Sequence, residues 1–356
     1  MMQREILDEI RAQVVAALIE KSPWIPEQEF ENESRALRDI SLGLGPFAQI
    51  LEEESFTDFF INSPAGAWIN RGVGLEEIAF PIDERALVNF IRSQALRAGK
   101  FFDQAHPAVD LELSAGVRLH ALLPPLVEHG VHLSLRINQR ESAWRVSEQQ
   151  RAALNLIILS RKNFLISGGT GSGKTTLLSQ LIEEIPATER LLVIEDTHEI
   201  QANHRHLLRL RARESNSEGI GAISIRELIR HALRMKPDRI FLGEVRGADV
   251  LDLFLALNTG HDGSGGTIHG NSPRDIPNRI AALAMTAGIP REGALALFAS
   301  SIDLIIHLDG ERNGNRIASI SQVVFREDQL MIEEIIAVPE EFTSAHLATL
   351  KGAFQS

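Results

Sequence analysis

The spacing of apolar residues predicts a helical arm followed by a small mixed domain. In residues 1–45 apolar side chains recur every three or four positions, which is typical of amphipathic helices. From Thr57 short apolar runs alternate with turn residues, and a helix is expected over about 83–98, ending at Gly99. Two further strands are expected at Val117–Leu122 and His132–Ile137. Residues 46–140 are therefore predicted to form an α+β N-terminal domain.

A doubly wound α/β domain is predicted for residues 141–356. The polar stretch Asn138–Arg145 is the expected linker, and Ser147 with Gln150 has the pattern of a capping box at a helix start. Strands and helices then alternate, which is typical of a mostly parallel sheet. The expected elements are Asn163–Ser167, Lys174–Glu184, Arg190–Glu195, Leu207–Leu210, Ile225–Met235, Arg239–Val245, Ala248–Leu257 and Gly266–His269, and a peripheral hairpin from Arg316–Phe325 and Gln329–Val338.

Composition and charge narrow the class of protein. The 356 residues carry 36 Lys and Arg against 48 Asp and Glu, a net charge of −12, and no cysteine, which excludes disulfides, cysteine-ligated zinc and thiolate catalysis. Apolar runs are far shorter than the ~20 residues that span a bilayer, and the acidic N-terminus is unlike a signal peptide. Residues 1–60 hold 13 acidic and 5 basic side chains, whereas residues 201–250 hold 6 and 10. We therefore expect a soluble, cytoplasmic protein without broad nucleic-acid or lipid binding.

A phosphate-binding loop is predicted where an apolar strand meets a helix. The sequence GGTGSGKT matches G-x-x-x-x-G-K-[ST] in full, and such a loop cradles phosphates with backbone N–H groups and a helix N-terminus. Lys174 is expected to neutralise the β- and γ-phosphates of ATP, and the Thr175 hydroxyl to bind Mg²⁺. The predicted nucleotide-binding residues are Gly168, Gly169, Thr170, Gly171, Ser172, Gly173, Lys174, Thr175 and Thr176.

Acidic residues end two of the expected strands. Glu195 and Asp196 follow one strand, with Glu199 close behind, and Glu244 follows another. Ligand groups gather beyond the carboxyl ends of strands in an open α/β sheet, so both clusters are expected to face the phosphates. A Walker B strand usually ends in Asp and a second acid, but Gly243 stands at the Asp position. Either Glu195 or Glu244 is expected to orient or deprotonate the attacking water, and Asp196 to reach Mg²⁺ through water.

Histidines are the remaining candidates. His269 ends another expected strand, and Ser272 and Pro273 after it predict a helix start. A neutral imidazole there would hydrogen-bond the γ-phosphate or its attacking water and so sense the nucleotide. His261, in the loop NTGHDGS, is a weaker candidate for contact with the nucleotide.

The motifs together resemble the secretion ATPase superfamily, the hexameric motors of type II and type IV secretion and pilus assembly. IEDTHEI resembles its Asp box, GEVRGAD its atypical Walker B motif and GGTIHGNSP its His box. SIRELIRHALRMKPDRI and NTGHDGS, with the N-terminal signals FTDFFINSP, FFDQAHPAVD and LELSAGVRLHALLPP, are most similar to the tight-adherence (Flp) pilus branch. The resemblance covers about residues 50–310 and implies a RecA-like P-loop NTPase domain behind the N-terminal domain.

The resemblance also implies how such a motor is built. It implies a homo-oligomer, a hexameric ring, with ATP and Mg²⁺ between the two domains. It implies docking to an inner-membrane platform protein at the cytoplasmic face, without specific nucleic-acid binding or membrane insertion. Arginines are expected to reach the γ-phosphate, because a planar guanidinium stabilises charge on a transferring phosphoryl group. The positions that match are Arg118, Arg136 and Arg213 and, more loosely, Arg226 and Arg234.

Departures from the family pattern keep alternatives open. Pro277 is expected to break the helix after the His box, and Gly266 and Gly270 to loosen the strand end that carries His269. The tetracysteine zinc module of many type II ATPases is absent from a chain without cysteine. The missing Walker B Asp leaves room for an ATP-binding scaffold that hydrolyses little. A nucleic-acid motor that uses the basic residues of 201–250 and a small-molecule kinase are further alternatives.

Overall fold

The computed structural model describes residues 45–355, except for the segments 48–49, 52–55, 63–65, 72–73, 81–82, 114–116, 138–146, 312–313, 327–328 and 339–341. The predicted linker, and the predicted arm up to residue 44, lie outside the described residues. The contacts divide the chain between Gln139 and Arg140 into an N-terminal and a C-terminal unit, and Asn216–Ile220 groups with the N-terminal unit. Each unit is described by itself.

The N-terminal unit contains one antiparallel sheet and one longer helix. Its elements are η1 (Gly45–Phe47), β1 (Asp58–Asn62), β2 (Gly66–Asn70), β3 (Leu75–Ile78), α4 (Glu84–Arg97), β4 (Ala108–Glu112), β5 (Val117–Leu122) and β6 (His132–Ile137). The strand order is β3-β2-β1-β6-β5-β4, with every neighbouring pair antiparallel. The α+β prediction and the strands at 117–122 and 132–137 are confirmed. The outer strands β3 and β4 were not predicted.

Helix α4 begins and ends where the sequence predicts. The Ala86 N–H donates to the Asp83 side chain at 2.9 Å, which caps the start, and Gly99 follows the end in the left-handed conformation with φ +70°. The helix buries one side against the core formed by the sheet, with Leu87, Ile91 and Ala95.

The C-terminal unit alternates strands and helices. Its elements are α5 (Glu148–Leu159), β7 (Phe164–Gly168), α6 (Lys174–Glu183), β8 (Leu191–Glu195), β9 (Leu207–Arg211), α7 (Ile225–Leu233), β10 (Arg239–Val245), α8 (Asp249–Leu257), β11 (Gly265–His269), η3 (Pro273–Asp275), α9 (Ile276–Thr286), α10 (Arg291–Ser301), β12 (Leu304–Glu311), β13 (Gly314–Arg326), β14 (Gln329–Ala337) and α11 (Ser344–Gln355). The predicted capping box is present: Gln150 N donates to Ser147 Oγ at 3.2 Å, and Ser147 N donates to the Gln150 side chain at 2.9 Å.

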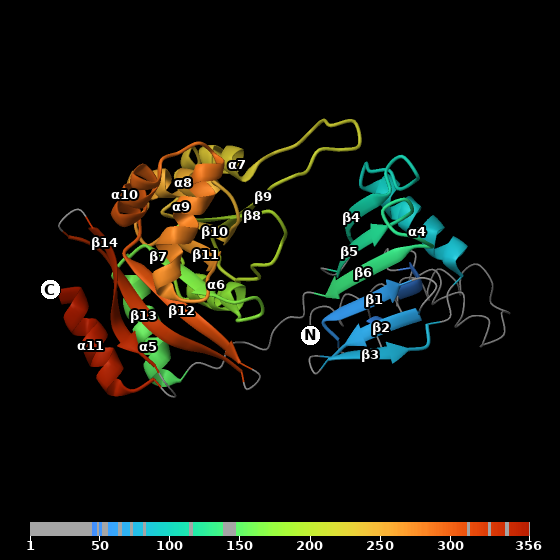
Figure 1. Ribbon diagram of the computed structural model, residues 1–356. Coiled ribbons are helices and arrows are strands. Elements are labelled where there is room, and N and C mark those ends of the chain that lie inside the picture. Colours follow the sequence, from blue (N-terminus) through green and yellow to red (C-terminus); the bar gives the residue numbers. More distant parts are fainter. Residues whose placement is uncertain are drawn as a thin grey trace, which may run out of the picture. The chain divides into compact units, whose positions relative to one another are not determined.

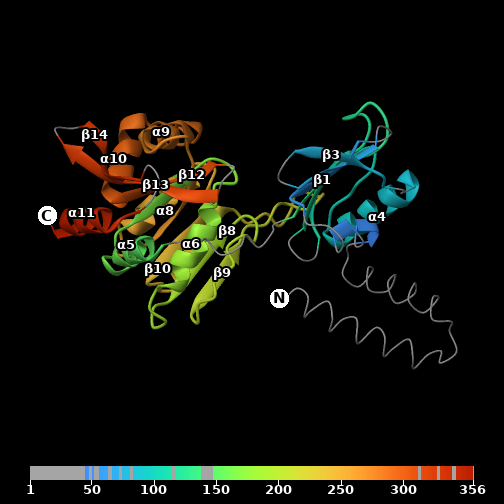
Figure 2. The same ribbon diagram turned by 90° about the horizontal axis from the view of Figure 1, so that it is seen from below.

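One sheet forms the centre of this unit, in the order β14-β13-β12-β7-β11-β10-β8-β9. Neighbours from β12 to β9 are parallel, whereas β13 and β14 are antiparallel. Helices α5, α6 and α11 pack on one face and α7 to α10 on the other, as Figures 1 and 2 show. Phe164, Leu165 and Ile166 of β7 alternate between the two cores, so the central strand is buried on both faces. The predicted P-loop, RecA-like α/β fold is confirmed.

The predicted C-terminal hairpin is part of the central sheet. Its first strand, β13, pairs with β12, which in turn runs parallel to β7. Ile320 and Ile336 of the hairpin are fully buried in the core that β7 also lines. The hairpin lies at the end of the strand order, but its apolar side chains belong to the core. Strand β12 and helices α10 and α11 were not predicted.

Two sequence expectations about the segment near His269 are wrong. Helix α9 begins at Ile276, so Pro277 lies in the first turn, where its missing N–H removes no helical hydrogen bond. A Cβ on Gly266 would lie 2.7 Å from the Leu242 carbonyl oxygen, and one on Gly270 would lie 2.5 Å from Ile276 Cδ1. These glycines therefore allow close packing rather than loosen the strand end.

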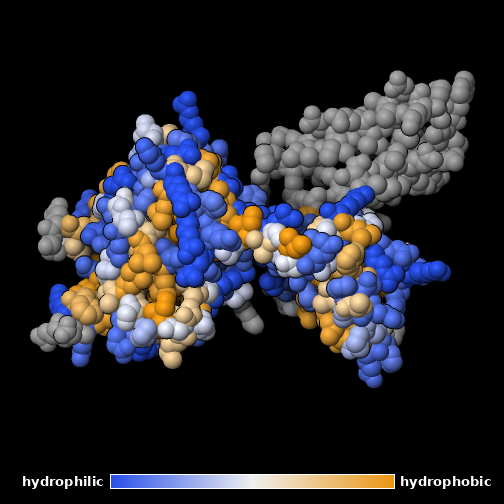
Figure 3. Space-filling view, turned by 90° about the horizontal axis from the view of Figure 1, so that it is seen from above, coloured by the Kyte–Doolittle hydropathy of each residue, from blue (hydrophilic) through white to orange (hydrophobic). Residues whose placement is uncertain are grey.

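Among the described helices, none has both the length and the apolar content needed to cross a bilayer. Exposed apolar side chains of the C-terminal unit include Leu255 of α8 and Met285 of α9. On the face shown in Figure 3, apolar and polar residues are intermixed.

Candidate active site

The predicted site residues of the C-terminal unit meet at the carboxyl ends of neighbouring parallel strands. Strand β7 ends at Gly168, β8 at Glu195 and β11 at His269, while Glu244 is the last but one residue of β10. The register places His269 opposite Gly168, and Leu242 opposite Ile194. Because parallel strands end at one edge of the sheet, residues from three motifs lie beside the P-loop.

The P-loop adopts a phosphate-binding form. Gly171 and Gly173 have φ of +74° and +79°, which side chains disfavour, and Gly173 precedes α6 without a side-chain cap. The start of α6 at Lys174 is therefore a helix N-terminus, a position that favours anions. Lys174 is buried, and its Nζ donates to the carbonyl oxygens of Gly168 at 3.1 Å and Gly169 at 2.6 Å.

The residues present fit ATP and Mg²⁺. Positions for a Cβ on Gly169 and Gly171 meet no atom within 4 Å, so the loop is open on the side a nucleotide would take. The Thr175 hydroxyl donates to Glu199 Oε2 at 3.4 Å, which places a carboxylate next to the predicted metal-binding hydroxyl. Within the described residues no group of three or more His, Asp or Glu is placed to hold a metal ion by itself.

Glu195 is buried and held by backbone donors. Its side chain is 4% exposed, and its Oε1 accepts hydrogen bonds from Glu199 N at 3.0 Å and Ile200 N at 2.7 Å. Burial raises the pKa of this carboxyl, while the two backbone donors act in the opposite direction. His198 Nδ1 lies 3.6 Å from Oε2. Glu195 is therefore a buried carboxyl held in place by two backbone N–H groups.

A chain of contacts joins the P-loop lysine to Glu244. His269 Nδ1 lies 3.4 Å from Lys174 Nζ, and His269 Nε2 lies 2.7 Å from Glu244 Oε1. Burial and the charge of Lys174 lower the pKa of His269, so the neutral imidazole is favoured. Since the ammonium of Lys174 can only donate, Nδ1 accepts and Nε2–H donates to Glu244. His269 thus contacts both the P-loop lysine and Glu244, a candidate catalytic carboxylate.

Asp196 is also placed at this edge. Its Oδ1 accepts from Thr197 N at 2.8 Å, and its Oδ2 lies 2.6 Å from Arg246 NH1. Arg246, directly after β10, also contacts Glu244. The sequence reasoning did not single out Arg246, although its place two residues after Glu244 is the available signal.

The matched arginines fall in both units. Arg118 and Arg136 face each other across β5 and β6 of the N-terminal unit, and Arg136 Nε is 2.9 Å from Asp58 Oδ1. In the C-terminal unit, the backbone of Arg213 pairs with Ile223. Arg226 forms a 2.8 Å ion pair with Asp252, and Arg234 directly follows α7 as its C-cap residue. The γ-phosphate role stays a prediction for Arg118, Arg136 and Arg213 and, more loosely, for Arg226 and Arg234.

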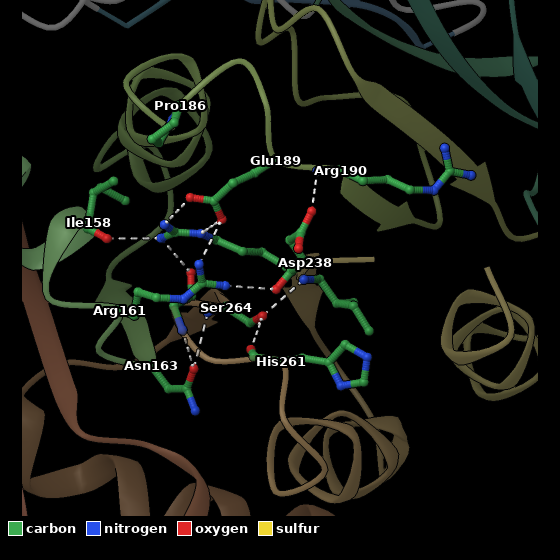
Figure 4. A network of polar contacts seen from close by, with 12 residues as sticks. Ile158, Arg161, Asn163, Pro186, Glu189, Arg190, Asp238, His261 and Ser264 are labelled. Carbon is green, nitrogen blue, oxygen red and sulfur yellow. Dashed lines mark hydrogen bonds and ion pairs between the residues drawn. The ribbon is translucent and has the colours of Figure 1, made fainter. Parts of the chain in front are cut away.

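His261 lies at the other edge of the sheet, before the start of β11, so the suggested nucleotide contact is wrong. There the loop joins a network of polar contacts, in which Figure 4 labels Glu189, His261 and Ser264, and His261 O accepts from Ser264 Oγ. Arg239 binds Glu189 through two hydrogen bonds of 2.8 and 2.9 Å and donates to Ile158 O at 3.0 Å. The NTGHDGS loop therefore stabilises the fold.

His307 is a further residue that the sequence reasoning missed. Its Nδ1 lies 2.9 Å from the hydroxyl of Ser167, one residue before the P-loop, and its ring also hydrogen-bonds the Asn271 backbone. Burial lowers the pKa of His307. His307 thus links the P-loop strand to the turn after His269. Its only sequence signal is a histidine within an apolar strand.

Comparisons with known proteins identify the family of the chain. The chain matches the family of type II/IV secretion system proteins over residues 42–326. The putative conjugal transfer protein Rv3659c of Mycobacterium tuberculosis strain H37Rv is 39% identical over 298 residues, covering 79% of this chain and 84% of that protein. VirB11 of Agrobacterium tumefaciens strain 15955 is 30% identical over 305 residues, covering 74% and 88%. The pilus retraction motor PilT with bound ADP has a similar fold, with a TM-score of 0.54, 19% identity and 86% of each chain covered.

The family match spans all motifs from the P-loop to the His box. Similarity to the tight-adherence branch in particular stays a prediction. The chain therefore belongs to the type II/IV secretion system protein family, the secretion ATPases that its motifs resemble.

Proposed function

We propose that the chain is a Mg²⁺-dependent ATPase motor that couples hydrolysis to pilus assembly or protein secretion at the cytoplasmic face of a membrane. One observation carries the proposal: Lys174, His269 and Glu244 follow one another in contact distance from the P-loop to a carboxylate. A P-loop alone binds a nucleotide. The contacts from Lys174 through His269 would connect the phosphate site to Glu244, a carboxylate that could act on water.

The residues divide the chemistry among them. Lys174 and the N–H groups at the start of α6 would hold the β- and γ-phosphates, for which Lys174 must leave the carbonyl oxygens of Gly168 and Gly169. Mg²⁺ bound at Thr175, with Asp196 reaching it through water, would neutralise charge on the phosphates. Glu195 or Glu244 would orient the attacking water and accept its proton.

Assembly and docking belong to the same proposal. We expect a homo-oligomer, a hexameric ring, in which Arg118, Arg136 and Arg213 stabilise charge on the transferring phosphoryl group. We expect peripheral association with the inner membrane through a platform protein of a pilus or secretion system. VirB11 and a putative conjugal transfer protein are the named relatives that support a secretion role.

An ATP-binding scaffold with little turnover is the second candidate. It is favoured by Gly243 at the Walker B Asp position and by the engagement of both Glu244 oxygens, one by His269 and one by Arg246. Steady-state phosphate release separates the candidates, because a scaffold binds ATP without sustained release.

Lys174→Ala tests the proposal. It removes the phosphate-binding ammonium, while the hydrogen bond from Ser172 Oγ to Gly169 O and the glycine turns of the loop remain, so we expect normal folding and a loss of turnover of about 100-fold or more. The matched control is Lys162→Ala, which removes an ammonium 3.0 Å from Asp303 at the opposite edge of the sheet. Undiminished phosphate release in Lys174→Ala would refute the assignment.

A further inference from the structure

The guanidinium of Arg246 lies between two carboxylates from neighbouring strands. Arg246 NH1 is 2.6 Å from Asp196 Oδ2, while Arg246 Nε and NH2 contact Glu244 Oε2. Asp196 directly follows β8, and Glu244 lies near the end of β10, which pairs with β8. Arg246 therefore ties together the two strand ends that carry the candidate metal and water ligands.

The two carboxylates need a cation between them. Adjacent strands bring like charges together at this edge, and an unshielded pair of carboxylates is unfavourable. Asp196 and Arg246 side chains are 41% and 53% exposed, whereas Glu244 is 13% exposed. The arginine side chain can therefore swing into solvent without disturbing the core, while Glu244 stays where it is.

The same contacts occupy the oxygens that the chemistry needs. Glu244 Oε1 is engaged by His269, and Oε2 by Arg246. Asp196 Oδ1 accepts from Thr197 N, and Oδ2 from Arg246. In this arrangement Arg246 competes with a metal-bound or attacking water for Asp196 Oδ2 and Glu244 Oε2. Asp196 and Arg246 are both exposed, but the long arginine side chain is the one whose charged group can leave the site while its backbone stays in place.

We propose that Arg246 is a built-in counter-ion that closes the resting site and gives way to the divalent cation. In the resting arrangement its guanidinium neutralises Asp196 and Glu244. When the divalent cation arrives, that cation takes over neutralisation and both carboxylates are released. Arg246 is thus a positioning residue that links metal arrival to the readiness of Glu244. This inference rests on the proposed ATPase function for the identity of the cation.

Mn²⁺ binding to the nucleotide-free protein tests the proposal without any turnover. Free Mn²⁺ is measured by electron paramagnetic resonance during titration of wild type and Arg246→Gln. Without the competing guanidinium, the variant is expected to bind Mn²⁺ at least about fivefold more tightly. The control Arg326→Gln removes the same charge from an exposed ion pair with Glu333 in the β13–β14 hairpin and is expected to leave Mn²⁺ affinity unchanged.

Two further variants locate the effect. Asp196→Asn in the Arg246→Gln background is expected to cancel the gain, because one of the released carboxylates is lost. Arg246→Lys, whose compact ammonium spans the two carboxylates less well, is expected to fall between wild type and Arg246→Gln, and it keeps the test open if the glutamine variant does not fold.

Equal or weaker Mn²⁺ binding by folded Arg246→Gln or Arg246→Lys would overturn the inference. So would an equal gain in Arg326→Gln, because it would reflect net charge alone. The outcome is separate from that of the proposed function, which fails if Lys174→Ala retains turnover. An unchanged Mn²⁺ affinity beside a Lys174-dependent ATPase would reject only the counter-ion role.

Discussion

Gly243 makes room for Glu195: a Cβ on Gly243 would lie 2.8 Å from Glu195 Cγ. The two residues lie at the ends of the paired strands β10 and β8. An Asp at position 243, as in a usual Walker B strand, would collide with the Glu195 side chain. The buried position of Glu195 therefore requires a glycine, and not an Asp, at position 243.

Gly243→Ala is expected to lower turnover by about tenfold or more, because it forces Glu195 off its two backbone donors and misplaces a candidate base. Affinity for a non-hydrolysable ATP analogue should change by less than about threefold, since Gly243 does not touch the P-loop residues. Steady-state phosphate release and analogue titration provide the two readouts.

Gly293→Ala in α10 is the matched control. Nothing lies within 4 Å of the Cβ position on Gly293, and an alanine suits a helix better than glycine. Turnover in this control should equal wild type. If Gly243→Ala also turns over normally, the fixed position of Glu195 has no part in hydrolysis.

Glu195→Gln and Glu244→Gln are expected to differ in kind. Glutamine at 195 keeps an oxygen for the two backbone donors but cannot accept a proton, so hydrolysis slows by about 100-fold while folding and nucleotide binding stay normal. Glutamine at 244 weakens the contacts to His269 and Arg246 and is expected to trap bound ATP. Single-turnover phosphate release and retention of labelled ATP on a filter distinguish the two. Wild-type rates in both variants would remove both residues as base candidates.

The raised pKa of Glu195 makes the free energy of unfolding depend on pH. Burial raises the pKa of its carboxyl, so between the usual glutamate pKa and this higher value the folded chain holds a proton that the unfolded chain has lost. Stability therefore falls as pH rises through this window and changes no further above it. Glu195→Gln has no proton to lose and should show a flatter profile, with higher stability than wild type at pH 8. Urea unfolding from pH 4 to pH 8 checks this, and parallel profiles would contradict it.

The P-loop and the strand ends could be predicted because each depends on a local pattern. A glycine-rich loop between a buried strand and a helix gives Lys174 its place, and the carboxyl ends of parallel strands bring Glu244 and His269 beside it. The strand order itself is not local. Strand β11 lies between β7 and β10. This order depends on which apolar faces pack together, and it cannot be predicted from any single stretch of sequence.

The remaining errors concern pairs of residues far apart in the chain. The role of Gly266 is visible only once Leu242 lies beside it, and the contact of Arg246 with Asp196 joins positions 50 residues apart. His261 was a weaker candidate for nucleotide contact, and it lies before the strand β11, which begins rather than ends there. Such contacts follow from tertiary packing.

Arg239→Met is expected to destabilise the C-terminal unit by about 3–5 kcal/mol, because it leaves the carboxylate of Glu189 without its main partner in a buried network. The Arg239 guanidinium is almost fully buried, and it also binds the carbonyl oxygens of Ile158 and Gly263. Urea unfolding measures the loss. Nucleotide affinity of the folded variant should stay unchanged, since the network lies at the opposite edge of the sheet from the P-loop.

Two variants control the Arg239 result. Arg326→Gln removes an exposed ion pair with Glu333 and should lower stability by less than about 1 kcal/mol. Glu189→Gln in the Arg239→Met background should recover part of the loss, because the uncompensated charge is then gone while the packing change remains. If Arg239→Met is no less stable than Arg326→Gln, the buried pair does not hold the amino ends of the strands together, and packing of the apolar cores alone accounts for the stability of this edge.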